Sequence, residues 1–165
     1  TGYAKTASNY SVTLRPMNDS VEDGFDQILW LDGQEHKYVE EAGQMNIFFR
    51  LGDSVVTPDL SGTILPGVTR ESVLTLLDDM GVTATERRLS MDELFLAQAN
   101  GELYEAFGAG TASVVVPIGR IRYHDSDLHF PDEQQGNLCP ELYNKILGIQ
   151  HGELEDRHYW MMPLE

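Results

Sequence analysis

The sequence has a single cysteine, few basic residues and no long apolar run. With only Cys139, the chain can form neither an internal disulfide framework nor a multi-cysteine metal site. Eleven Lys and Arg residues against 27 Asp and Glu residues give a formal net charge of −16, with no basic cluster to neutralise nucleic-acid phosphates. No apolar run approaches the roughly 20 residues that a membrane-spanning helix needs. These absences argue against a multi-cysteine metal site, a nucleic-acid partner and a membrane-spanning helix.

What remains is an ordinary globular composition. At 165 residues and 41% hydrophobic content, the chain is long enough for one domain with a sizeable core. Short apolar strands occur with three or four helical patterns in mixed order, which predicts an α/β (mixed α+β) domain with curled sheets and helices packed outside. Because the chain opens at Thr1 without Met, in a segment rich in polar and aromatic residues, we expect an upstream portion to be missing.

Hydrophobic periodicity and turn residues predict the order of the elements. Predicted strands cover 27–31, two pieces of 37–51, then 54–57, 82–88, 103–107 and 112–119, with a hairpin turning at 125–127. Predicted helices open near Thr69, after a capping box at Ser90 and Glu93, and at Pro140. A weak helical pattern before residue 25 contains Pro16, which should kink or shorten it.

Two loops are suited to an anion. LSGTILPGVTRESVL (60–74) has a Pro-Gly turn that feeds a helix, whose first backbone N–H groups and positive dipole end favour a phosphate. Residues 108–111 form a predicted small-residue loop, in which Thr111 adds a hydroxyl donor. Either stretch is also compatible with an ordinary turn. A nucleotide P-loop is not indicated, because the G-x-x-x-x-G-K-[ST] pattern is missing.

Three further side chains are candidates for catalysis or cofactor binding. Lys5 lies among small and polar neighbours and is either a solvated surface residue or a Schiff-base nucleophile. Glu41 ends an apolar strand, where it either faces water or pairs with a protonated pyridine nitrogen. Tyr10 either packs or donates a hydrogen bond to a phenolate oxygen. An aldehyde trap, a pyridinium partner, a phenolate partner and a phosphate site together match the needs of pyridoxal phosphate.

With these segments in this order, the chain resembles the C-terminal, larger domain of the branched-chain amino acid aminotransferases, which are fold-type IV pyridoxal-phosphate enzymes. The segments that carry the resemblance are KTASNY (5–10), QILWLDG (27–33), VEEAGQMNIFF (39–49), LSGTILPGVTRESVL (60–74), LSMDEL (89–94) and FGAGTASVVVPIG (107–119). The resemblance runs from about Gly2 to the C-terminal tail, and it implies that residues 1–165 are this one domain. It implies curled mixed sheets that form a pseudo-barrel, as in the large domain of D-amino acid aminotransferase.

The resemblance also implies roles for individual residues. Lys5 would form the Schiff base with pyridoxal 5′-phosphate and later move the proton between the substrate Cα and the cofactor C4′. Tyr10 would contact the phenolate oxygen of the cofactor, and Glu41 would contact its pyridine nitrogen. The phosphate would be bound by Val68, Thr69 and Thr111. The substrate carboxylate would be bound by Gln44 and Ala112.

The sequence departs from the family pattern at several places. Ala7 and Ser8 replace the usual Gly-Gly, Pro16 interrupts a helix that is normally regular, and Gln44 stands where many relatives have Thr or Gly. The family's N-terminal small domain, which supplies an arginine to the phosphate and most of the side-chain pocket, is not contained in these residues. The partner subunit of the family's homodimer also covers part of that pocket.

The resemblance implies a cytoplasmic transaminase that passes the amino group of leucine, isoleucine or valine to 2-oxoglutarate. Amino acids and 2-oxo acids would be its substrates. One alternative is another fold-type IV enzyme, such as a D-amino acid or amine transaminase or an aminodeoxychorismate lyase. The other is a truncated domain without catalytic activity, which the changes at Ala7, Ser8 and Pro16 would favour.

Overall fold

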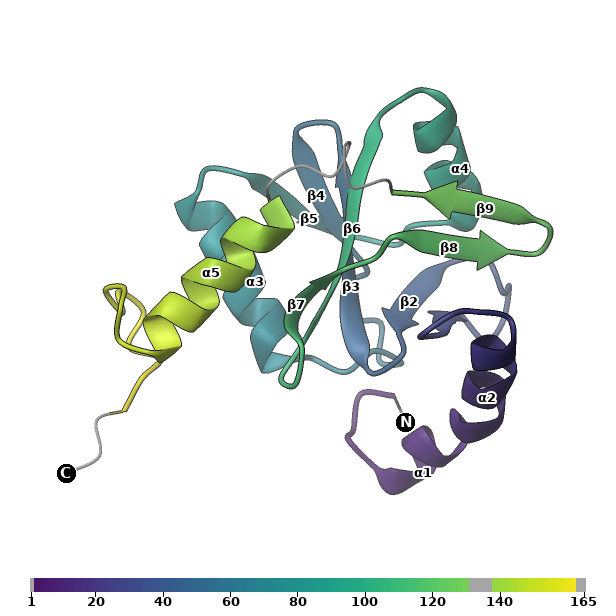
Figure 1. The fold of residues 1–165 in the computed structure, drawn as a ribbon, viewed down its shortest axis with the longest axis horizontal. Coiled ribbons are helices and arrows are strands. Elements are labelled where there is room, and N and C mark those ends of the chain that lie inside the picture. The colour runs from purple at the N-terminus through teal and green to yellow at the C-terminus, as the bar shows by residue number, and fades with distance from the viewer. Residues whose placement is uncertain (1, 131–137, 163–165) are drawn as a thin grey trace.

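The computed structural model of the chain describes residues 2–130 and 138–162, and its central element is strand β3 (Met45–Leu51) (Figure 1). Strands β2 (Val39–Ala42) and β4 (Ser54–Thr57) pair with the two ends of one edge of β3, while β6 (Leu103–Gly110) pairs along the other edge. The sheet continues to β1 (Leu29–Leu31) beyond β2, to β5 (Thr83–Glu86) parallel to β4, and to β7 (Val114–Pro117) beyond β6.

A separate hairpin and the helices complete the fold. Strands β8 (Arg120–Tyr123) and β9 (Ser126–His129) form a two-stranded sheet of their own. Helices α3 (Val68–Asp79) and α5 (Leu138–Gln150) pack together on one face of the large sheet, and α4 (Met91–Ala99) lies with the hairpin on the other face. The predicted mixed α/β class is confirmed. Within the described residues the seven-stranded sheet is open rather than closed into a barrel.

Strand β3 is apolar on both faces because both faces are covered. Phe48 belongs to the core under α3 and α5, whereas Ile47 and Phe49 belong to the core under α4 and the hairpin. Phe48 lies directly opposite Phe107 of β6, and their rings stack with centroids 5.2 Å apart. A two-sided core of this kind fixes the register of β3, since a one-residue slip would exchange the two sets of side chains.

The first helices are short and have no buried residues. They are α1 (Ala7–Ser11) and α2 (Leu14–Glu22), which lie near the β1–β2 end of the sheet (Figure 1). The helical pattern breaks between them, so Pro16 falls in the first turn of α2, where its missing N–H removes no intrahelical bond. The prediction that this pattern is shortened is confirmed, and Gly24, with φ of 80°, follows the end of α2.

Helices α3 and α4 follow the sequence prediction closely. The N-cap Ser90 accepts a hydrogen bond from the backbone N–H of Glu93 (3.2 Å), which confirms the predicted cap of α4. Helix α3 begins one residue before the predicted Thr69, and Gly81, with φ of 69°, follows its C-cap. Such a left-handed conformation is the usual reason for glycine at a helix end.

The predicted loop at 108–111 is wrong for residues 108–110, because β6 continues as far as Gly110, whereas Thr111 lies in the turn that follows. Gly108 and Gly110 pair with β7, and Gly108 also pairs with β3. The Met45 side chain lies over both glycines: a Cβ at Gly108 would come within 2.9 Å of Met45 Cε, and one at Gly110 within 3.2 Å of Met45 Cγ. Glycine therefore allows a close approach within a strand here.

Two smaller boundaries also differ from the prediction. The hairpin turn consists of residues 124 and 125, since Ser126 already pairs with Tyr123. Helix α5 begins at Leu138 rather than Pro140, so the proline lies in its first turn. The buried Glu105 accepts a hydrogen bond from the Cys139 backbone N–H (3.1 Å) at this helix start.

Cys139 is buried, as expected for an unreactive thiol. Burial and the nearby Glu105 raise the pKa of the thiol to about 11, which disfavours the thiolate. No helix of the described segments is long and apolar enough to cross a membrane. The described residues also contain no group of three His, Cys, Asp or Glu side chains that could hold a metal ion.

Candidate active site

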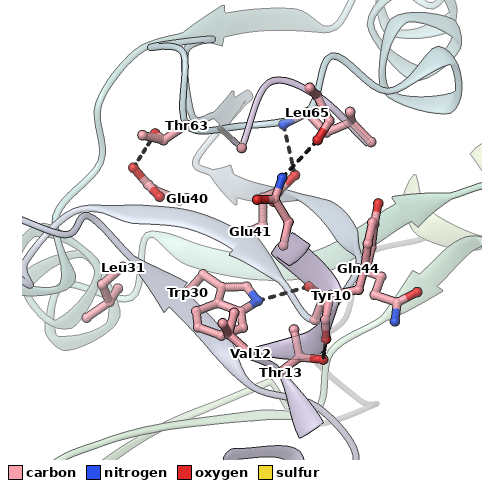
Figure 2. Close-up of a pocket in the computed structure, with 14 residues that line it drawn as sticks. Tyr10, Val12, Thr13, Trp30, Leu31, Glu40, Glu41, Gln44, Thr63 and Leu65 are labelled. Carbon is pink, nitrogen blue, oxygen red and sulfur yellow. Dashed lines mark hydrogen bonds between the residues drawn. The ribbon is translucent and has the colours of Figure 1, made fainter. Parts of the chain in front are cut away.

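A pocket of about 210 Å³ lies between the N-terminal segment, the β1–β2 strand pair and the loop after β4 (Figure 2). Its lining comes from segments far apart in the sequence: Gly2, Ala4, Asn9, Tyr10, Val12, Thr13, Trp30, Leu31, Glu40, Glu41, Gly43, Gln44, Thr63 and Leu65. Two carboxyl groups, a phenol and an indole are therefore gathered around one cavity. This is the kind of mixed apolar and polar lining that small-molecule sites have.

The N-terminal segment is held against the loop after β4. The Tyr3 backbone N–H donates to the Gly62 carbonyl (3.3 Å), and Gly2 lies so close to the Thr63 backbone that a Cβ would overlap the Thr63 carbonyl. Thr63 Oγ1 in turn donates to Glu40 Oε1 of β2 (2.6 Å). These contacts join the beginning of the chain, the loop and the sheet, so one wall of the pocket depends on residues that are about 60 positions apart.

Trp30 and the turn after β2 form another wall. Trp30 is paired with Glu41 across the β1–β2 ladder, and its Nε1 donates to the Gly43 carbonyl (3.0 Å). Gly43 has φ of 58°, and a Cβ there would overlap Gln27 Oε1. The indole therefore holds the tight turn that carries Gln44 into the pocket lining.

Glu41 is the chemically distinctive group of the pocket. Burial raises its pKa from an ordinary 4.5 to about 7, and the charge of Glu40 adds to the shift, while a hydrogen bond from the Leu65 backbone N–H (3.2 Å) opposes it. Asn46 Nδ2 also approaches Glu41 Oε1, at 3.4 Å. A carboxyl with this pKa changes charge near neutral pH and is stabilised in its ionised form by a cation placed beside it.

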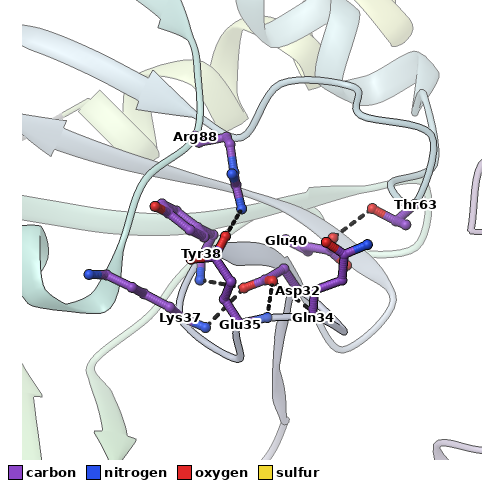
Figure 3. A network of polar contacts seen from close by, with 8 residues as sticks. All are labelled: Asp32, Gln34, Glu35, Lys37, Tyr38, Glu40, Thr63 and Arg88. Carbon is purple, nitrogen blue, oxygen red and sulfur yellow. Dashed lines mark hydrogen bonds and ion pairs between the residues drawn. The ribbon is translucent and has the colours of Figure 1, made fainter.

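Asp32 closes the hairpin that presents Glu41 (Figure 3). Its carboxylate accepts four backbone N–H groups, from Gln34, Glu35, Lys37 and Tyr38, at 2.7 to 3.3 Å. These bonds lower the pKa of Asp32 well below its ordinary range. Because the same loop leads from β1 to β2, Asp32 contributes to the register that sets Trp30 opposite Glu41.

The start of α3 is an uncapped helix N-terminus. Gly67 is its N-cap and makes no side-chain capping bond, so the backbone N–H groups of Val68 and Thr69 lie in the first turn without that competitor. The guanidinium of Arg70 is buried and directed elsewhere: its Nη2 donates to the Pro58 carbonyl (2.9 Å) and to Glu86 Oε2 (2.7 Å). This first turn therefore offers an anion backbone donors rather than the Arg70 side chain.

The residues predicted from the sequence are only partly brought together. Tyr10, Glu41 and Gln44 line the same pocket. Lys5 is exposed and follows the lining residue Ala4, whose carbonyl accepts from Asn9 Nδ2 (2.8 Å), but Lys5 itself is not in the lining.

The predicted anion-binding residues lie outside the pocket lining. Val68 and Thr69 begin α3, a few residues beyond the lining residue Leu65. Thr111 and Ala112 are exposed in the turn between β6 and β7. That turn adjoins the lining, because a Cβ at Gly110 would lie 3.7 Å from the Gln44 carbonyl oxygen.

Trp30, Thr63 and Asn46 belong to the pocket or its support but are not among the site residues that the sequence predicts. Asn46 had a usable signal: it is a polar residue inside the apolar strand sequence MNIFF, and a buried polar side chain requires a partner. Trp30 and Thr63 carried no comparable signal, because an indole in an apolar strand and a threonine in a loop are each ordinary.

Comparison with known proteins adds a family assignment. Residues 1–121 match the family model for class IV aminotransferases. A probable branched-chain-amino-acid aminotransferase of Staphylococcus epidermidis is 48% identical over 163 residues, which is 99% of this chain and 46% of that protein. The chain thus spans about half the length of the curated relatives it matches.

Solved structures support the same fold. The branched-chain amino acid aminotransferase of Escherichia coli is 24% identical with a TM-score of 0.83, over 100% of this chain and 50% of that one. The T.th. branched-chain amino acid aminotransferase, complexed with N-(5′-phosphopyridoxyl)-L-glutamate, is 27% identical with a TM-score of 0.81, over 98% of this chain and 50% of that one. From the family match and these likenesses, the chain belongs to the class IV aminotransferases.

Proposed function

We propose that this chain is the cofactor-binding large domain of a branched-chain amino acid transaminase that uses pyridoxal 5′-phosphate. The observation that carries the proposal is the pocket in which Glu41, with its raised pKa, lies with Tyr10 beside the segment that contains Lys5. The 48% identity to a probable branched-chain-amino-acid aminotransferase supports the substrate class.

The donor and acceptor groups of the site fit this cofactor. Glu41 is a desolvated carboxyl that would gain from a pyridinium N–H, and Tyr10 has a phenol that would donate to the phenolate oxygen. The uncapped first turn of α3, with Val68 and Thr69, would hold the phosphate, joined by the Thr111 hydroxyl. When bound, pyridoxal phosphate supplies an electron sink for negative charge at the substrate Cα.

The remaining roles belong to Lys5 and to the turns around the pocket. Lys5 Nζ would hold the cofactor and carry the proton between the substrate Cα and the cofactor C4′. Gln44 and Ala112 would bind the substrate carboxylate through backbone N–H groups. Glu41 would keep the ring nitrogen protonated, and its raised pKa reflects the stabilisation that a cationic partner would restore.

The proposal also includes parts of the protein outside this domain. An N-terminal small domain would supply an arginine to the phosphate and most of the pocket for the branched side chain, and a homodimer partner would cover part of it. The curled pseudo-barrel of the large domain and a cytoplasmic location belong to the proposal as well. Leucine, isoleucine or valine would be the amino donor and 2-oxoglutarate the acceptor.

Amino transfer from leucine to 2-oxoglutarate by the protein at its natural length tests the proposal. We expect turnover in the presence of pyridoxal phosphate, its loss in Glu41→Ala, and its retention in Glu102→Ala, which removes an exposed carboxylate on a turn. Activity with a D-amino acid, an amine or aminodeoxychorismate but none with leucine would replace this function by another of fold type IV. A protein that stays colourless in excess cofactor would indicate a non-catalytic domain.

A further inference from the structure

Asn46 lies between the two ends of the proposed cofactor site. It is a residue of β3 that pairs with Glu41 of β2 on one edge and with Ala109 of β6 on the other. Only 6% of its surface is exposed, so its side-chain amide is withdrawn from water. A buried amide is retained at a low cost only where its hydrogen bonds are made within the protein.

The amide of Asn46 contacts both Glu41 and the segment before α3. Its Nδ2 donates to the Leu65 carbonyl (2.9 Å) and approaches Glu41 Oε1 (3.4 Å), while the Leu65 backbone N–H donates to the same carboxyl oxygen (3.2 Å). Figure 2 shows the Glu41 carboxyl directed towards Leu65. Glu41, Asn46 and Leu65 therefore form one closed group of hydrogen bonds.

The other side of the amide limits which residue can precede α3. Gly67, the N-cap of this helix, has an ordinary φ of −71°, so its conformation does not require glycine. Its surroundings do, because a Cβ at Gly67 would overlap Asn46 Oδ1. The helix N-terminus is therefore seated against the Asn46 side chain.

We propose that Asn46 is a positioning residue that sets the distance between Glu41 and the first turn of α3. It thereby fixes the position of Glu41, the partner of the cofactor ring, relative to the backbone N–H groups of Val68 and Thr69, the donors to its phosphate. The inference rests on the proposed function, because only a ligand with a cationic ring and a phosphate would bridge the two ends. Asn46 itself touches neither the ring nor the phosphate in this role.

Binding of pyridoxamine 5′-phosphate and of pyridoxamine, followed by ligand fluorescence, tests the inference in the protein at its natural length without any turnover. Asn46→Ala removes the bridge, and Gly67→Ala pushes the helix start away from it. We expect each substitution to weaken binding of the phosphorylated ligand about tenfold, which corresponds to a loss of about 1.4 kcal/mol in binding free energy. The preference for the phosphorylated over the unphosphorylated ligand should fall by a similar factor, since ring and phosphate no longer fit together.

The double variant is the sharpest arm of the experiment. In an Asn46→Ala background the clash at residue 67 is relieved, so adding Gly67→Ala should cost little more. Gly33→Ala is the matched control, because a Cβ there meets nothing within 4 Å. Asn46→Asp, which keeps the size but not the donor, should repeat the loss of preference if Asn46→Ala fails to fold.

Distinct results would overturn the inference and the proposed function. If the unmodified protein binds neither ligand, both fall. If it binds the phosphorylated ligand but Gly67→Ala behaves like Gly33→Ala, the inference alone falls. The inference also falls if the fold-losses in affinity of the two single variants multiply in the double variant. It falls as well if the variants weaken the binding of the phosphorylated and the unphosphorylated ligand equally.

Discussion

Trp30 and Glu41 lie directly opposite each other on β1 and β2, and both line the pocket. The indole also donates to the Gly43 carbonyl, at 3.0 Å, so the Trp30 side chain holds the turn that follows Glu41. The short β1–β2 ladder therefore contributes both side chains to the pocket lining as well as forming an edge of the sheet. Its consequences can be measured at each of the residues involved.

Trp30→Phe should destabilise the protein and loosen the turn that carries Gln44. The substitution keeps an aromatic ring but removes the donor to the Gly43 carbonyl, and a lost hydrogen bond of this kind costs about 1 kcal/mol. Urea unfolding of both proteins gives the difference. Trp160→Phe is the comparison, since Trp160 lies in the C-terminal segment; a loss there as large as at Trp30 would contradict the bracing role.

Glu41→Gln should change how the cofactor-free protein responds to pH. Because the folded pKa of Glu41, about 7, lies above its unfolded value near 4.5, the unfolded chain releases this proton first as pH rises. The stability that Glu41 contributes is therefore fully present below pH 4.5 and is lost as pH rises through about 7. Glu41→Gln lacks this loss, so its melting temperature should exceed that of the unmodified protein at pH 8 more than at pH 4.5.

A pH-independent difference between these two proteins would contradict the burial of an ionisable Glu41. Added pyridoxal phosphate provides a second arm, because a pyridinium beside Glu41 favours the ionised carboxylate. We expect the cofactor to remove most of the loss above pH 7 in the unmodified protein and to have no such effect on Glu41→Gln.

Asp32→Asn should destabilise the loop between β1 and β2, most strongly at neutral pH. The four backbone N–H donors depress the folded pKa of Asp32, so its contribution is present above the ordinary value near 3.8 and is lost as pH falls below it. The gap in melting temperature between the variant and the unmodified protein should narrow from pH 7 towards pH 2. A gap that widens on acidification would refute the assignment.

Phe107→Ala should be severely destabilising. Phe107 is fully buried and stacked on Phe48, so the substitution leaves a cavity in the core beneath α3 and α5 and costs about 3–5 kcal/mol. Tyr104→Ala on the same strand is the control: Tyr104 is 42% exposed, and the change should cost less than about 1 kcal/mol. Equal losses in denaturant unfolding would argue against a core at Phe107.

The sequence was informative wherever a local rule decides the structure. The Ser90 cap, the start of α3 and the division of 37–51 into two strands depend on neighbours within a few residues, and the structure has all three. Glycine usually marks turns, which predicts a loop at 108–111, yet residues 108–110 form the end of β6. Their strand conformation depends on Met45, about 60 residues away in the sequence, whose side chain covers them.

The sequence predicts which chemical groups the candidate site contains but not how they are arranged in space. Glu41 stood out as a carboxyl between apolar strands, and its burial and raised pKa agree with that reasoning. The bridge from Asn46 to Leu65 joins positions 19 residues apart, and no local pattern indicates which carbonyl the buried amide reaches. The contact of Gly2 with Thr63 was hidden for the same reason, since it is set by long-range packing.

Chemical trapping at Lys5 tests the central proposal most directly. Lys37 and Lys145 form ion pairs with Asp92 and Glu141, whereas Lys5 has no ion pair with any described residue. Borohydride reduction of the protein with pyridoxal phosphate should fix the cofactor on the peptide containing Lys5, as mapped by mass spectrometry. Labelling should vanish in Lys5→Ala and persist in Lys37→Ala and Lys145→Ala; labelling that is unchanged in Lys5→Ala would contradict the account.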